Sequence, residues 1–252
     1  LRKTIFDVAI SNGDINLLNN VTSKKKYAIS YSLQNLEKFI RKRQTNAFFK
    51  NKPKIVFIGK YHSSRRPILT RIFGYRYLKL AVDDIFNNTI LNNNIDKHKA
   101  VFTSRPDRNL QMLLDIWKNK IYTKNTKNKL YVTPTKEISN FNDCNIFSRD
   151  MLDQKDYLNN IKNSRLMLIP GHKSELFCLA AEEARELCVP IVTLGIGCLK
   201  ERVSHGKTGF VAKNENFKLG FKLVRGAYHE KEIAKAKKNG YKTPVHIKKE
   251  DT

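Results

Sequence analysis

The fold is decided by the segment from Ser164 to Asn214, which reads SRLMLIPGHKSELFCLAAEEARELCVPIVTLGIGCLKERVSHGKTGFVAKN. Its succession of apolar and polar runs predicts a strand, a loop, a helix, a second strand, a glycine-containing loop and a short closing turn. Two glutamates, Glu175 and Glu183, frame the first turns of the predicted helix. Carboxylates beside the unpaired amides of a helix start are suited to holding a phosphorylated sugar.

The predicted helix covers 174–188, with Ser174 as its N-cap and the amides of Leu176–Leu179 facing the loop. Glu175 and Glu183 are eight positions apart, which on a helix is roughly 12 Å with a rotation near 80°. Both carboxylates could then border one cleft. The alternative is that Glu183, beside Glu182, belongs to an ordinary helix surface.

Strands and helices alternate through the second half of the chain, which predicts βαβ units and a parallel sheet. In such a sheet ligands lie beyond the carboxyl ends of the strands, where we expect Arg105, Glu175 and Gly195. We expect strands at 100–104, 130–133, 145–147, 166–169 and 190–194, and helices at 108–118, 155–163 and 174–188.

The first 97 residues mix helix and strand patterns. Helical spacing of apolar residues predicts a helix over 29–43, and KIVFIG predicts a buried strand over 54–59. The apolar and basic stretch 69–82 predicts an amphipathic helix that packs against the core or on a membrane surface. The polar run at 96–99 predicts a break between two domains.

Arg105 and Arg108 follow the first strand of the second half in the sequence SRPDRN. Guanidinium groups at that place could clamp a diphosphate with bidentate geometry, or could be an ordinary solvated pair. The sequence has no Asp-x-Asp motif. Positive side chains and helix amides would then neutralise the phosphates in place of a metal ion.

The formal net charge is +25, from 48 Lys+Arg and 23 Asp+Glu, which favours anionic partners. A basic nucleic-acid-binding module is one alternative, but it rests on charge alone because no RNA-binding or zinc-finger spacing occurs. The four cysteines have no metal-binding or disulfide spacing, which predicts a reducing, cytoplasmic location. The basic first half would also suit the inner face of an anionic plasma membrane.

The sequence PGHKSELFCLAAEEA, followed by VPIVTLGIGCLKERV and HGKTGFVAKN, resembles the Glu-x7-Glu region of group 1 (family 4) retaining glycosyltransferases of the GT-B fold. The upstream VFTSRPDRNLQMLLDIW is similar to that family's first strand, basic pair and helix, and the resemblance covers about 98–216. It implies an α/β fold in which 98–217 form a Rossmann-type, nucleotide-sugar donor-binding domain with a parallel sheet. Residues 1–97 would be a partial N-terminal α/β acceptor domain, since a full one is longer.

The resemblance also implies an activity, namely retaining, metal-independent transfer of a sugar from a nucleotide-sugar to a saccharide or lipid-linked acceptor. No cofactor beyond the donor, no catalytic metal and no specific nucleic acid would be needed, and peripheral contact with an anionic membrane is expected. Glu175 would be the catalytic residue beside the sugar, and Glu183 would hold the ribose. The donor-binding residues implied are Arg105, Arg108, Phe177, Cys178, Leu179 and Glu183.

This sequence departs from the family pattern at three points. Cys178 stands where Gly usually follows Phe177, and Arg108 stands where Lys is common. The spacing between Arg105 and Arg108 is also shorter than usual. These departures concern the residues that would surround the phosphates.

Residues 218–252 do not continue the glycosyltransferase pattern. The sequence KLGFKLVRGAYHEKEIAKAKKNGYKTPVHIKKEDT resembles a fragment of proline dehydrogenase, with Lys222 and Tyr228 at positions near the flavin and substrate of that enzyme. One strand and one helix cannot close an eight-stranded barrel, so the segment is not expected to be a domain or to carry flavin-dependent activity. Our interpretation is a fusion or assembly artefact, and an appended peptide is the alternative.

Overall fold

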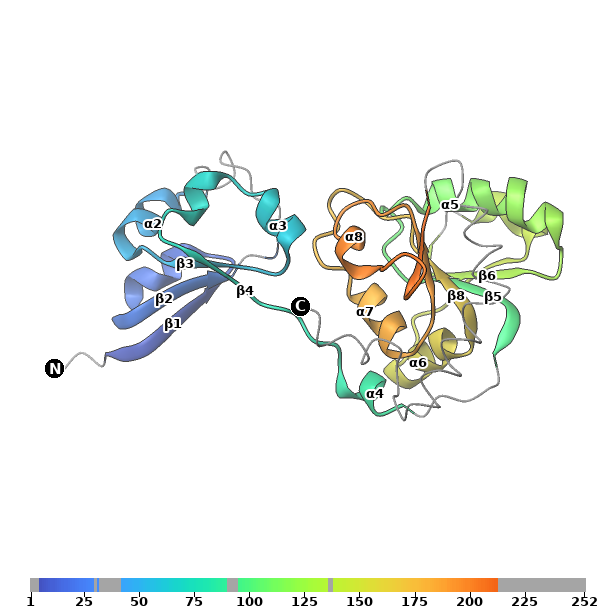
Figure 1. Cartoon of the computed structure of the whole chain (residues 1–252), viewed down its shortest axis with the longest axis horizontal. Helices are drawn as coiled ribbons and strands as arrows, with labels where there is room; N and C mark the ends of the chain where they lie inside the picture. Colours follow the sequence, from blue (N-terminus) through green and yellow to red (C-terminus); the bar gives the residue numbers. More distant parts are fainter. Residues whose placement is uncertain (1–4, 30, 32–41, 90–94, 136–137, 213–252) are drawn as a thin grey trace. The chain divides into compact units, whose positions relative to one another are not determined.

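The computed structural model describes residues 5–29, 31, 42–89, 95–135 and 138–212. The chain divides into two compact units, one of residues 1–80 and one that begins at Ala81 (Figure 1). The boundary therefore lies earlier than the break expected near residue 97. The expected helix at 29–43 and the segment 218–252 fall mostly or wholly outside the described residues.

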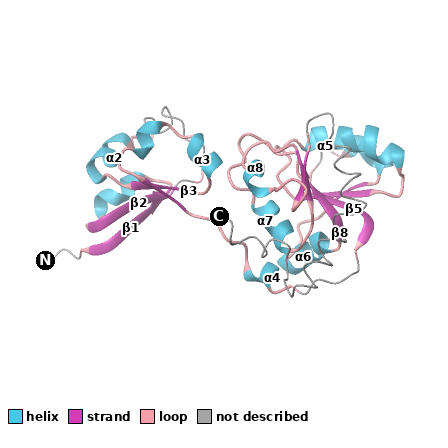
Figure 2. Cartoon of the chain, viewed as in Figure 1, coloured by secondary structure: helices cyan, strands magenta, loops and turns pink. Residues whose placement is uncertain are grey.

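The first unit is a four-stranded parallel sheet in the order β1-β2-β3-β4 (Figure 2). Phe48 and Phe57 are completely buried at the centre of its core. The strand predicted at 54–59 is confirmed as β3. The strands are β1 Phe6–Asn12, β2 Ser23–Ile29, β3 Lys54–Phe57 and β4 Tyr75–Tyr77, and the helices are η1 Ile15–Asn20, α2 Thr45–Asn51, α3 Lys60–Ser64 and η2 Ile68–Arg71.

The amphipathic helix expected over 69–82 is wrong. The segment forms the last turn of η2, bends at Gly74 with φ +89°, and then enters β4. Tyr75 and Tyr77 are aromatic residues that favour a strand, and both rings pack at a tilt against Phe57 of the neighbouring strand. Cross-strand aromatic packing therefore overrides the helical spacing of the apolar residues.

The second unit is a six-stranded parallel sheet in the order β10-β9-β8-β5-β6-β7. Strands β5 and β8 are neighbours at the centre of the sheet. From β5 the chain continues to β6 and β7 on one side, and from β8 it continues to β9 and β10 on the other side, so the strand order reverses between β5 and β8. The strands are β5 Asp96–Phe102, β6 Lys129–Val132, β7 Ile146–Ser148, β8 Ser164–Leu168, β9 Ile191–Thr193 and β10 Gly209–Val211.

Helices cover both faces of this sheet, with α5 on one side and α6 and α7 on the other (Figure 1). All five residues of β8 are buried, as its continuous apolar run predicts. The predicted apolar face of α5 is confirmed, because Leu110, Leu113, Leu114 and Trp117 are buried in one cluster. The helices are α4 Asp84–Asn87, α5 Leu110–Ile116, η3 Trp117–Ile121, η4 Tyr122–Lys124, η5 Ser139–Cys144, α6 Gln154–Lys162, α7 Leu179–Glu186 and α8 Leu199–Arg202.

The polar run at 96–99 is the beginning of β5 and not a break between domains. Asp96 pairs with Ser164 of β8, and the register shifts before Ala100. The polar side chains are tolerated because this end of the strand is only partly buried. The parallel ladder, rather than hydrophobicity, therefore sets where the strand begins.

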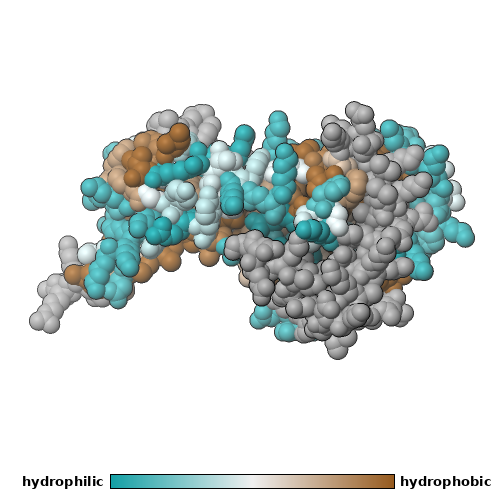
Figure 3. Space-filling view, viewed as in Figure 1, coloured by the Kyte–Doolittle hydropathy of each residue, from teal (hydrophilic) through white to brown (hydrophobic). Residues whose placement is uncertain are grey.

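Hydrophilic residues cover much of the visible face, interrupted by smaller hydrophobic patches (Figure 3). Each of the four cysteines is a buried thiol. Within the described ranges, no helix has both the length and the apolar character needed to cross a membrane.

Candidate functional site

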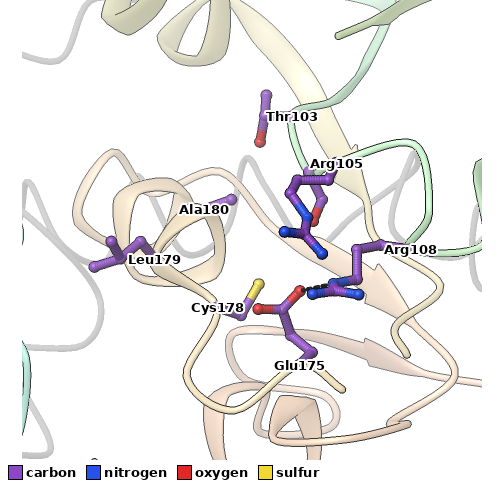
Figure 4. A pocket seen from close by; sticks show the side chains of 8 residues that line it. Thr103, Arg105, Arg108, Glu175, Cys178, Leu179 and Ala180 are labelled. Carbon is purple, nitrogen blue, oxygen red and sulfur yellow. Dashed lines mark hydrogen bonds and ion pairs between the residues drawn. The ribbon is translucent and has the colours of Figure 1, made fainter. Parts of the chain in front are cut away.

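A pocket of about 320 Å³ opens at the point where the strand order reverses. One wall is the segment that follows β5, and the other is the segment that follows β8. In open parallel sheets this crevice, beyond the carboxyl ends of the two central strands, is where ligands bind. The lining residues are Thr103, Ser104, Arg105, Arg108, Glu175, Cys178, Leu179 and Ala180 (Figure 4).

Arg105 and Arg108 bring two guanidinium groups to the pocket, as the sequence predicted for their position. Figure 4 shows both groups and the Glu175 carboxylate directed toward the same space. The Arg105 side chain is 69% exposed and is held by both oxygens of Asp107, at 3.1 and 2.7 Å. This carboxylate contact raises the pKa of Arg105. Arg105 therefore lies at the mouth of the pocket as a fixed positive charge.

Arg108 lies deeper, with only 12% of its side chain exposed. Its Nε donates to Glu175 Oε2 at 3.2 Å, and its Nη1 donates to Asp107 Oδ2 at 2.9 Å. Nη1 also lies 3.4 Å from Nδ1 of His172, which accepts the amide hydrogen of Ser174. Across the part of the chain that the structure describes, no hydrogen bond is found for Nη2 of Arg108. This nitrogen can donate to a ligand.

Glu175 does not lie on the helix, contrary to the prediction. The segment 174–178 forms turns, and α7 begins only at Leu179, so Ser174 is not its N-cap. The helical distance and rotation expected between Glu175 and Glu183 therefore do not apply. Glu175 instead precedes the helix, and its side chain is 17% exposed against Arg108.

The loop between Ile196 and Cys198 fixes the backbone around Glu175. The Cys198 amide donates to the Glu175 carbonyl at 3.0 Å, and Gly171 forms a bridge with Ile196. Gly197 has φ +73°, and a Cβ on it would lie 2.3 Å from the carbonyl oxygen of His172. Only glycine fits such a close approach in the left-handed region. The Gly197 loop thus positions the catalytic candidate.

Cys178 is the N-cap of α7 and has a left-handed backbone with φ +63° and ψ +77°. This conformation explains why glycine is common at the matching position, since a side chain is strained there. No side-chain hydrogen bond caps the helix. The first amides of a helix have no partner within it, so those of Leu179 and Ala180 are available at the pocket wall. Burial raises the pKa of the Cys178 thiol to about 12, which keeps it in the neutral form.

Glu183 lies one turn further along α7 and does not line the pocket. It is half-buried, and burial raises the pKa of its carboxyl above the ordinary value. The hydroxyl of Tyr157 donates to its Oε2 at 2.6 Å. The alternative that Glu183 is an ordinary surface residue does not describe this environment.

Phe177, like Glu183, is a predicted donor-binding residue that does not line the pocket. Its ring is buried under Arg202, whose Cζ lies 3.9 Å from the ring centroid. Arg202 Nε also donates to the Phe177 carbonyl at 3.1 Å, and its Nη1 pairs with Glu182 at 3.0 Å. Phe177 therefore anchors the turn before α7.

Sequence reasoning missed Thr103, Ser104 and Ala180 in the lining and Tyr157 beside Glu183. Thr103 and Ser104 directly follow β5, so their place after a buried strand was a usable signal. Tyr157 on α6 carried no signal, because its contact with α7 depends on the packing of two helices. Within the described segments, no group of three or more His, Cys, Asp or Glu residues could hold a metal ion.

Comparison with known proteins gives two kinds of result. The proline dehydrogenase family matches residues 206–252, and in the described part of this segment residues Gly209–Val211 form β10. No curated protein matches the chain.

Solved structures match at low sequence identity. TarM matches with a TM-score of 0.65 and 14% identity over 89% of this chain and 50% of TarM, so the chain spans about half the length of that protein. Anabaena Alr3699/HepE, solved in complex with UDP, matches with a TM-score of 0.61 and 13% identity over 87% of this chain and 64% of that one. A trehalose-6-phosphate synthase matches with a TM-score of 0.62 and 9% identity over 93% of this chain and 68% of that one.

These matched proteins are GT-B glycosyltransferases, and they share with this chain its mixed α/β architecture and parallel sheets. At such low identity the likeness concerns the fold. The described chain has the fold of the GT-B glycosyltransferases.

Proposed function

We propose that the chain binds a nucleotide-sugar in the pocket at the strand reversal and serves in a glycosyltransferase. The observation that carries the proposal is one cleft containing two guanidinium groups, a carboxylate and the amino end of a helix. Arginines and helix amides recognise phosphate oxygens, and a carboxylate recognises sugar hydroxyls. A diphosphate-sugar presents phosphate oxygens and sugar hydroxyls side by side.

In this proposal the diphosphate lies between Arg105, Arg108 and the amides of Leu179 and Ala180. The positive end of the α7 dipole and the two guanidinium groups then stabilise the charge that develops on the leaving diphosphate. These groups are all supplied by the chain, which supports transfer without a metal ion. Phe177 contributes by holding the turn in place, and the Cys178 side chain forms part of the wall.

Glu175 is proposed as the residue beside the reacting sugar. Arg108 donates to its Oε2, which orients the carboxylate and leaves Oε1 to accept a sugar hydroxyl near the anomeric carbon. Retention of configuration is supported by the resemblance of the Glu-x7-Glu segment. It is also the subject of the structural work on the trehalose-6-phosphate synthase that shares this fold.

Glu183 is proposed to hold the ribose of the carrier nucleotide. A TarM variant from S. aureus was solved with UDP and alpha-GlcNAc-glycerol, which makes a uridine carrier and a saccharide or lipid-linked acceptor reasonable first choices. We propose that the reaction occurs in the cytoplasm or at the inner face of the membrane, where the net charge of +25 favours contact with anionic lipid.

Calorimetric titration with UDP, GDP and ADP tests the proposal. We expect wild type to bind one of them, and Glu183→Ala to weaken that binding by roughly tenfold or more. Arg76→Ala, an exposed change in the first unit, is the control and should bind as wild type does.

Absence of binding by wild type, or unchanged binding by Glu183→Ala, would contradict the proposal. Salt-sensitive retention on DNA that none of the nucleotides displaces would favour the nucleic-acid alternative instead. Flavin absorbance in the purified protein would favour the proline dehydrogenase alternative.

A further inference from the structure

Tyr157 connects α6 to the ribose end of the proposed site. Its hydroxyl donates to Oε2 of Glu183 at 2.6 Å. We propose that Tyr157 is a positioning residue that orients the Glu183 carboxylate to receive the ribose hydroxyls of the bound nucleotide. The inference rests on the proposed function and adds to it a residue that the sequence did not reveal.

Glu183 needs a positioning partner because of its place on α7. Leu179 and Ala180 line the pocket, and Glu183 follows them by four and three residues, so it lies on the same side of the helix. A glutamate has several rotatable bonds and can turn toward solvent unless a contact holds it. Among the described residues, Tyr157 is the one hydrogen-bond partner found for this carboxylate, so Oε1 remains available to a ligand.

Tyr157 is itself held by two contacts with its ring. Phe86 packs edge-on at 6.3 Å between centroids, and the Arg149 guanidinium lies 5.5 Å from the ring centroid. Thr103, which lines the pocket, is also close enough to the hydroxyl to influence the pKa of Tyr157. Tyr157 therefore lies between the end of β5 and the Glu183 carboxylate of α7.

The hydrogen bond also favours the charged form of Glu183. Burial raises the pKa of its carboxyl, and the Tyr157 hydroxyl acts in the opposite direction by stabilising the carboxylate. A charged carboxylate accepts two ribose hydroxyls better than a neutral acid does. Further titratable groups near this position include the neutral Cys178 thiol before α7 and Arg149 beside the tyrosine ring, and the neighbours of Glu183 on α7 itself are Glu182, Arg185 and Glu186.

Tyr157→Phe tests the inference because it removes one oxygen and keeps the ring that packs on Phe86. The probe is whichever of UDP, GDP or ADP the wild type binds most tightly, together with its 2′-deoxy analogue, titrated by calorimetry. We expect about a tenfold loss of affinity for the ribonucleotide and a smaller loss for the deoxy form. The preference for ribose should therefore fall. Tyr131→Phe removes the same atom from a partly exposed residue on β6 and is the matched control.

The pH profile gives a readout that a loss of packing would not produce. In Tyr157→Phe the carboxyl of Glu183 loses the hydrogen bond that favours its charged form. As the pH is lowered, ribonucleotide affinity should therefore begin to fall at a higher pH than in the wild type. Glu183→Gln should show no such fall.

The outcomes separate this inference from the function on which it rests. If wild type and Glu183→Gln differ in ribonucleotide affinity but Tyr157→Phe matches wild type in affinity, ribose preference and pH profile, the inference is overturned and the proposed function stands. If wild type binds a nucleotide and neither variant changes it, the ribose role of Glu183 is overturned together with the inference. If wild type binds none of the probes, both fail.

Discussion

Replacing Arg108 by alanine removes the most enclosed cation of the proposed phosphate site. Arg108 contributes one hydrogen bond to Glu175 at 3.2 Å and one to Asp107 at 2.9 Å. Without it, the Glu175 carboxylate, whose side chain is only 17% exposed in the wild type, loses its charged partner. Both the stability of the second unit and its affinity for a nucleoside diphosphate should fall.

The two contacts differ in weight because they differ in exposure. The bond to Glu175 is mostly shielded and should contribute about 1.5–3 kcal/mol, whereas the pair with Asp107, which is 56% exposed, should contribute about 0–1 kcal/mol. We therefore expect Arg108→Ala to lower the free energy of unfolding by about 1.5–4 kcal/mol. Loss of one charged contact with phosphate should raise the Kd for the nucleotide roughly 10- to 100-fold.

Urea unfolding followed by tryptophan fluorescence measures the first effect. Trp117 is the only tryptophan in the sequence and is fully buried in the second unit, so its emission reports on that unit. Arg108→Lys keeps the charge without the planar fork and should fall between alanine and wild type. In Arg108→Ala with Glu175→Gln, the loss should be smaller than the sum of the single losses, because no unpaired carboxylate remains. Stability within 0.5 kcal/mol of wild type and an unchanged Kd in Arg108→Ala would refute this reasoning.

Three further outcomes are expected. Gly197→Ala should lower the free energy of unfolding by at least about 2 kcal/mol and abolish nucleotide binding, because the added Cβ would meet a backbone carbonyl. Gly206→Ala is the control, since Gly206 has a similar φ but open space around it, and this change should cost about 1 kcal/mol. Equal urea midpoints for the two variants would contradict this prediction. Because burial raises the pKa of Glu183, its folded form binds a proton more readily than its unfolded form, so its contribution to stability is present at low pH and is lost as pH rises through the raised pKa. Nucleotide affinity should rise as pH increases across that range, because the charged carboxylate is the form proposed to bind ribose. If the stability of Glu183→Gln depends on pH as that of the wild type does, this carboxyl is excluded as the cause. Trp117→Phe removes the bond from Nε1 to the Cys144 carbonyl and leaves a space, which should cost about 2–4 kcal/mol by circular dichroism in urea; an unchanged midpoint would show that this bond is unimportant.

The sequence predicted most of the alternation of strands and helices in the second unit, because the buried part of most strands there is a short apolar run. The exception is 209–211, which was expected to be a closing turn and forms β10. The buried face of α5 was also predictable, since its leucines recur at helical spacing. The prediction failed over 69–82, where apolar residues at helical spacing are used by a turn and a strand. The local sequence pattern could not predict the packing of Tyr75 and Tyr77 on Phe57, because that contact depends on the neighbouring strand.

The candidate site was predicted as a set of residues better than as a geometry. Arg105, Arg108, Glu175, Cys178 and Leu179 do line one pocket. The predicted start of α7 was five residues too early, because Ser174 is a favourable N-cap residue. The segment 174–178 is held outside the helix by its contact with the Gly197 loop. Because that loop is distant in the chain, the local sequence could not reveal the contact.

The position of β10 determines where the chain can be shortened. Gly209–Val211 pair with β9, a Cβ at Gly209 would strike the Ile191 carbonyl, and Ala212 is buried in the main core cluster. The proline dehydrogenase match begins at residue 206, before this strand. A deletion designed from the match alone would strip an edge strand from the sheet and uncover β9, leaving unpaired backbone groups that favour aggregation. A shortened protein for crystallisation or binding studies should therefore keep every residue up to Ala212.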